Sequence, residues 1–114
     1  GLHASRKQWR TELETYCAKG EKVAVFGAGH LAAKFINFYE LSDLIDCVID
    51  DHPKKVGMIM PGSGLKVVPS TDLLSRGIQV CISTLSPESE IKVRVKLATF
   101  FDAGGRFVPA FATV

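Results

Sequence analysis

A glycine-rich turn constrains the fold of this chain more than any other sequence feature. Residues Gly27-Ala28-Gly29-His30-Leu31-Ala32 fit the pattern G-x-G-x-x-A, and they directly follow the apolar, β-branched run 22–26. Such a run predicts a buried strand. From His30 to about Glu40 the apolar residues change to helical spacing. A strand, a glycine turn and a helix in this order open a βαβ unit.

The alternation of strands and helices continues along the chain. The expected elements are a helix at 5–19, strands at 22–26 and 45–49, a loop with a small hairpin at 54–64, a short strand at 65–68, a capped helix at 70–77, and strands at 78–82 and 106–109. Pro109 predicts that the last strand is short or lies at an edge. The fold class is therefore α/β, a three-layer Rossmann-like domain with a mostly parallel sheet and an extra N-terminal helix.

Three helices have expected buried faces. In the first, Trp9, Leu13 and Tyr16 form one apolar stripe. In the helix from His30, the expected core row is Leu31, Phe35, Phe38 and Tyr39, with Ala32 and Ile36 beside them on the same side. The segment 91–97 alternates like a strand, but Ser86 as N-cap and Pro87 at N1 favour a helix that runs to Gly104-Gly105. This helix would have two apolar rows and should therefore be well covered by the rest of the domain. The first row is Ile91, Val95 and Ala98, and the second is Val93, Leu97, Phe100 and Phe101.

Length, charge and cysteine content limit the function classes. The 114 residues predict a single domain, 1–114, and 14 Lys and Arg against 12 Asp and Glu favour neither nucleic acid nor a membrane as partner. Cys17, Cys47 and Cys81 have no metal-ligand spacing, and the last two are expected to be buried thiols. Without a signal peptide or apolar span, we expect a cytoplasmic protein. Because the chain starts at Gly1 rather than Met, we expect it to be a fragment of a longer chain.

The glycine turn is the first candidate binding site. In a doubly wound sheet, ligands bind in the crevice at the carboxyl ends of the strands. Backbone amides at the start of a helix attract phosphate, and an acidic residue after the second strand can accept hydrogen bonds from a ribose or sugar hydroxyl. The candidate cofactor-binding residues are Gly27, Ala28, Gly29, His30 and Asp50. The alternative is that the two glycines only form a compact turn in a domain that binds nothing there.

Other polar residues follow neighbouring strands at the same predicted edge. We expect them to line the opposite wall of the crevice as substrate-binding residues: Asp51, Ser83, Thr84 and Ser86. Because adjacent residues on a strand end point to opposite sides, only one of Asp50 and Asp51 should face the crevice. No carboxylate pair, Ser/His/Asp order or metal constellation is legible, so the catalytic residues stay unassigned.

Four segments together resemble a known family. They are 23–29, the D-x-P-x-K-x-G element within 49–57, Met60-Pro61-Gly62, and the closing run Gly104-Gly105-Arg106-Phe107-Val108-Pro109. This order is similar to the C-terminal domain of sugar C-methyltransferases. The N-terminal nucleotide-binding domains of sugar acetyltransferases and polysaccharide-biosynthesis dehydratases share the first two elements, but the closing run favours the methyltransferases.

The resemblance implies that the chain is the C-terminal fragment of a longer chain and that it forms a Rossmann-like domain that helps to hold a nucleotide-linked sugar. In the parent chain a zinc-binding segment and a domain for S-adenosylmethionine would precede it. Leu85-Ser86 replace the family's Trp-Asn pair, and its catalytic His and Glu-His have no match here. Two other hypotheses stay open. One is a non-catalytic module that binds NAD(P) or a nucleotide-sugar; the other is a docking or oligomerisation domain, which includes a homodimer.

Overall fold

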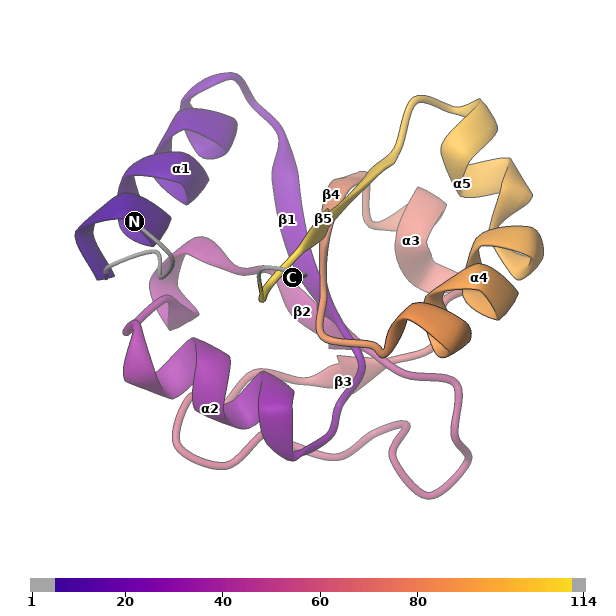
Figure 1. Cartoon of the computed structure of the whole chain (residues 1–114), viewed down its shortest axis with the longest axis horizontal. Helices are drawn as coiled ribbons and strands as arrows, with labels where there is room; N and C mark the ends of the chain where they lie inside the picture. The colour runs from indigo at the N-terminus through magenta and orange to yellow at the C-terminus, as the bar shows by residue number, and fades with distance from the viewer. Residues whose placement is uncertain (1–5, 112–114) are drawn as a thin grey trace.

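The computed structural model describes residues 6–111 and is an α/β fold around one parallel sheet (Figure 1). Its five strands are β1 (Lys22–Phe26), β2 (Cys47–Ile49), β3 (Val67–Val68), β4 (Ile78–Ser83) and β5 (Arg106–Pro109). They lie in the order β3-β2-β1-β4-β5, and every pair is parallel. The sheet is therefore Rossmann-like, with the longest strands, β1 and β4, side by side at its centre.

Helices cover both faces of the sheet. The helical elements are α1 (Arg6–Ala18), α2 (His30–Phe38), the 3-10 turn η1 (Ser42–Leu44), α3 (Asp72–Ser75), α4 (Pro87–Lys96) and α5 (Ala98–Asp102). Figure 1 shows α1 and α2 on one side of the strands and α3, α4 and α5 on the other. The helix that follows β1 and the helix that follows β4 thus lie on opposite faces of the sheet. This arrangement places a topological switch point between these two neighbouring strands.

Two apolar clusters fill the layers on either side of the sheet. Trp9 and Leu13 of α1 and Phe35 of α2 meet one face, where the rings of Trp9 and Phe35 lie edge to face with centroids 4.9 Å apart. Leu73, Leu97 and Phe100 cover the other face. The three-layer core expected from the alternation is confirmed, and so is the burial of Trp9 and Leu13, with Tyr16 partly buried beside them.

The expected buried face of α2 is confirmed in part. Ala32, Phe35 and Ile36 are buried, and Tyr39 packs partly buried against the same cluster. Leu31 and Phe38 were also expected in the core but are 52% and 74% exposed. The fully buried Ala32 lets the helix backbone approach β1 closely, which leaves these two larger side chains at the margin of the face.

The helix expected after Ser86 also differs. Backbone torsions at Leu97 (φ −100°, ψ 28°) divide it into α4 and α5. The second apolar row is confirmed, since Leu97 and Phe100 are buried. The first is not, since Ile91 and Val95 are 67% and 77% exposed. None of the ten residues of α4 is buried, so α4 is not the well-covered helix that its composition predicts.

The segment between β2 and β3 forms a long loop whose later part runs beside α2 (Figure 1). A single antiparallel bridge joins Ile59 to Lys66, in agreement with the small hairpin expected there. Asn37 of α2 donates a hydrogen bond to the carbonyl of Pro61 (2.9 Å), which ties the loop to the helix. Strands β2 and β3 are shorter than expected, because Ile45 and Asp46 form the connection from η1 to β2, and Leu65 and Lys66 belong to the loop before β3.

Candidate functional site

The carboxyl ends of β1, β2 and β4 meet at one edge of the sheet. Phe26 is paired with Ile49 on one side and with Ser83 on the other, so the residues that follow these three strands are neighbours. The Gly27 amide donates to the carbonyl of Ile49 (2.8 Å), and the Thr84 amide donates to the carbonyl of Phe26 (3.1 Å). The glycine turn is thus held between the loops after β2 and β4.

Gly27 is required by the fold. Its φ of +99° lies in the left-handed region, and a Cβ there would lie 2.8 Å from Thr84 Oγ1 and 3.2 Å from Leu85 Cδ2. Thr84 cannot easily move, because its buried hydroxyl donates to the carbonyl of Phe26 (2.8 Å). The first glycine therefore makes the tight turn that its motif predicts.

Gly29 has a different role from Gly27. It is the N-cap of α2, with φ −92° and ψ −168°, a conformation open to any residue, and a Cβ at this position would meet nothing within 4 Å. It offers no side chain to cap the helix. Because the first amides of a helix have no partner within the helix, the exposed Gly29 and His30 leave the positive end of α2 accessible.

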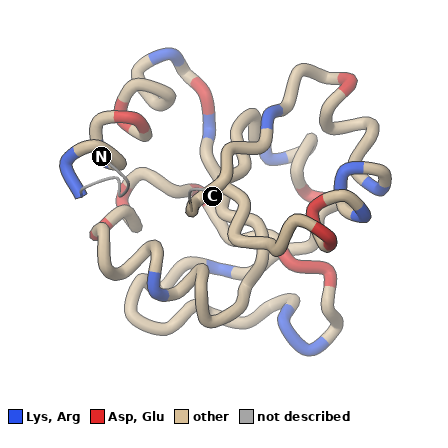
Figure 2. Tube along the Cα trace, viewed as in Figure 1, with Lys and Arg blue, Asp and Glu red and all other residues tan. Residues whose placement is uncertain are grey.

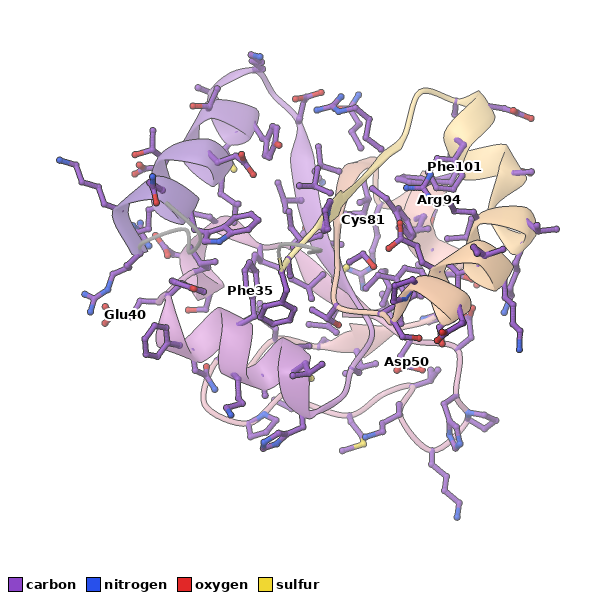
Figure 3. All side chains as sticks on the ribbon, viewed as in Figure 1. Phe35, Glu40, Asp50, Cys81, Arg94 and Phe101 are labelled. Carbon is purple, nitrogen blue, oxygen red and sulfur yellow. The ribbon has the colours of Figure 1, made fainter. Side chains whose placement is uncertain are left out.

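Asp50 joins the glycine turn to the loop after β2 (Figure 3). One carboxylate oxygen accepts the amide of Ala28 and the other accepts the amide of His52, each at 2.9 Å. The amides of Gly27 and Ala28 are thereby both engaged within the protein. Of the amides expected to bind phosphate, those of Gly29 and His30 remain at the helix start.

Asp51 points to other partners, as the alternation along a strand predicts. Its carboxylate accepts the amide and the hydroxyl of Ser70 and the ammonium group of Lys96, all at 2.7 Å. Burial disfavours the charged carboxylate, but these hydrogen bonds outweigh burial and hold the pKa of Asp51 below its ordinary value. Asp51 therefore links β2 to the end of α4.

The hydroxyl groups of the β4–α4 loop form hydrogen bonds within the protein. Ser83 Oγ donates to Glu90 Oε2 (3.2 Å) and accepts the amide of Leu85 (3.3 Å). Ser86 caps α4 by accepting the amide of Ser89, as its sequence predicts. With Thr84 bound to the carbonyl of Phe26, the substrate contacts expected of Ser83, Thr84 and Ser86 stay predictions.

Sequence patterning missed one network beside this loop. Arg94 donates two hydrogen bonds to Glu90 Oε1 (3.2 and 3.0 Å), and its guanidinium lies 5.1 Å from the ring centre of Phe101 and 5.3 Å from that of Phe107. Figure 3 shows Arg94 beside Phe101. The i, i+4 spacing of Glu90 and Arg94 was a usable signal for the ion pair, but the contact with Phe107 depends on the tertiary fold.

The remaining candidate groups lie elsewhere or are exposed. His30 and His52 are exposed, and His52 Nδ1 accepts the amide of Lys54 (3.1 Å). Cys47 and Cys81 are buried, and burial raises the pKa of each thiol to about 12, which agrees with the expected buried thiols. Within residues 6–111, no three His, Cys, Asp or Glu side chains form a metal-binding group.

A hollow of about 480 Å³ lies at the opposite edge, where β1 begins, beside Cys17, Lys22 and Asp46. Its acidic side chains already have cationic partners, for example Asp46 with Arg76 and Glu21 with Arg106. Figure 2 shows basic and acidic residues dispersed along the chain rather than gathered on one element. The carboxyl edge with its glycine turn therefore remains the best candidate site.

Comparison with protein families decides the relationship. The family model for the C-methyltransferase C-terminal domain matches residues 2–111. The chain belongs to this family. The resemblance expected from the sequence is thus confirmed at the level of the C-methyltransferase C-terminal domain. Among curated proteins, none matches the sequence. No helix within residues 6–111 is long and apolar enough to cross a membrane.

Proposed function

We propose that this C-methyltransferase C-terminal domain holds a nucleotide-linked sugar by its phosphates at the start of α2. One observation carries the proposal. Gly29 occupies a helix N-cap without providing a cap, and the fold does not require a glycine there. An open, uncapped N-terminus with free amides and partial positive charge favours an anion.

In this proposal the chain's residues bind and orient the substrate and perform no methyl transfer themselves. The amides of Gly29 and His30 face the phosphate. The loop 83–86 forms the neighbouring wall, held by the hydrogen bonds of Ser83 to Glu90 and of Thr84 to the carbonyl of Phe26. A preceding domain would supply the methyl group from S-adenosylmethionine. Membership of the C-methyltransferase family supports this division of work.

The test is a thermal-shift series with UDP-glucose, dTDP-glucose, NADH and S-adenosylmethionine. A ligand at about 100 times its dissociation constant adds about 2.7 kcal/mol of stability. We expect stabilisation by the sugar nucleotides. Stabilisation by NADH alone would support the dinucleotide module instead. The absence of any shift would contradict the proposal and favour the docking domain.

Two variants at position 29 make this test specific. In Gly29→Asp the new carboxylate should cap α2, raise stability by about 0.5 kcal/mol and abolish sugar-nucleotide binding, because it occupies the same amides. Gly29→Asn is the matched control, with the same size and cap but no charge, and it should weaken binding less. Unchanged binding by Gly29→Asp would place the ligand elsewhere.

A further inference from the structure

Asp50 has two partners, and both are backbone amides of the carboxyl edge. Its two oxygens accept from Ala28, in the turn after β1, and from His52, in the loop after β2, at equal distances of 2.9 Å. Hydrogen bonds of this kind to a carboxylate are stronger than those between neutral groups. The half-buried side chain is therefore fixed in an orientation along the edge of the sheet.

These partners differ from the partner that the sequence motif predicts for Asp50. In dinucleotide-binding folds the acidic residue after the second strand accepts hydrogen bonds from ribose hydroxyls. Here each oxygen of Asp50 already accepts one amide of the protein, and Ala28 is buried beside it. A ribose hydroxyl could therefore bind only as a second donor to an oxygen that is already engaged, because each carboxylate oxygen has two acceptor sites.

The same carboxylate also orders the loop after β2. By holding the His52 amide it fixes the residue whose Nδ1 accepts the amide of Lys54 and whose carbonyl accepts the amides of Lys55 and Val56. The glycine turn and the loop 52–56 are consequently coupled through one side chain.

We propose that Asp50 is a positioning residue: it fixes the glycine turn against the loop after β2 and accepts no hydrogen bond from the ribose. The site then recognises the phosphate groups, and its affinity for a nucleotide does not depend on the 2′-hydroxyl. The specificity part of this inference rests on the proposed function, whereas the positioning part concerns the ligand-free domain.

Amide hydrogen exchange of the ligand-free domain tests the positioning role. Asp50→Asn keeps the size but has one acceptor oxygen in place of two, so at least one of the amides of Ala28 and His52 should exchange at least tenfold faster while those of β4 are unchanged. Asp51→Asn is the matched control, because that neighbouring carboxylate binds Ser70 and Lys96 instead. Unchanged exchange at Ala28 and His52 in Asp50→Asn would overturn the role.

Calorimetric titration with UDP, 2′-deoxy-UDP and inorganic pyrophosphate tests the specificity. We expect UDP and 2′-deoxy-UDP to bind within threefold of each other, and Asp50→Asn to change all three affinities by a common factor. A tenfold preference for UDP that disappears in Asp50→Asn would identify Asp50 as a ribose reader and overturn the inference. If no probe binds, the proposed function and the specificity fail together, and hydrogen exchange still decides the positioning role.

Discussion

Two glycines separated by one residue serve different purposes in the turn after β1. Gly27 has a left-handed backbone and lies against Thr84 and Leu85, so the fold itself demands a glycine. Gly29 has an ordinary backbone conformation and open space beside it. A compact turn in a domain that binds nothing would explain the first glycine but not the second.

The pair gives a direct stability test. Gly27→Ala should lower the free energy of unfolding by about 2–3 kcal/mol, because the new Cβ is strained and collides with Thr84 Oγ1. Gly29→Ala should change it by less than about 1 kcal/mol. Urea unfolding of both variants measures the difference. Equal losses of unfolding free energy in the two variants would show that Gly27 does not have the strained, closely packed position assigned to it.

Asp51 should make stability depend on acid pH. Its folded pKa is depressed by Lys96 and Ser70 despite the opposing effect of burial. The contribution of Asp51 to the free energy of unfolding is therefore fully present above the unfolded pKa of about 3.9, and it is lost as pH falls through the lower, folded pKa. Wild type should exceed Asp51→Asn in urea midpoint at pH 7, and the gap should shrink below about pH 4. A gap that does not vary with pH would refute the assignment.

At the scale of elements, α4 is held to the rest of the domain mainly by polar side chains. It has no buried residue, and it is joined to the rest of the domain through Glu90 and Ser83, Arg94 and Phe107, and Lys96 and Asp51. The helix α2 has the opposite character, since Phe35 and Ile36 are almost fully buried. The two helices that flank the candidate site thus differ in how they are attached.

Matched isoleucines on the two helices test this contrast. Ile36→Ala should cost about 2–5 kcal/mol, as expected for a buried branched side chain, whereas Ile91→Ala should stay within about 0.5 kcal/mol, because its side chain is exposed. Thermal unfolding of the two variants is sufficient. A large loss in Ile91→Ala would mean that α4 has a covered face in solution.

Local sequence signals predicted the elements better than their orientation. The strand, glycine turn and helix after Lys22, the cap at Ser86 and the edge strand with Pro109 follow from chemistry within a few residues. The exact limits of the buried side of α2 do not, because Leu31 and Phe38 adjoin the face of Ala32, Phe35 and Ile36, and only packing against the sheet decides which of these side chains are covered.

For the whole molecule, the sequence predicted where the strands end but not which groups engage one another there. The carboxyl edge follows from the βαβ pattern. The contact of Asp50 with Ala28 depends on the register of β1 and β2, and that of Ser83 with Glu90 depends on how α4 lies over β4. Both are long-range geometric consequences that no local pattern encodes.

The most direct test of the central claim is a ¹H–¹⁵N NMR titration of the domain with UDP-glucose. If phosphate binds at the start of α2, the largest shifts should appear at the amides of Gly29 and His30, with smaller shifts at Ala28 and His52 through Asp50. The hollow beside Cys17 and Asp46 should not respond. Saturable shifts confined to that hollow, or no shifts at all, would contradict the account.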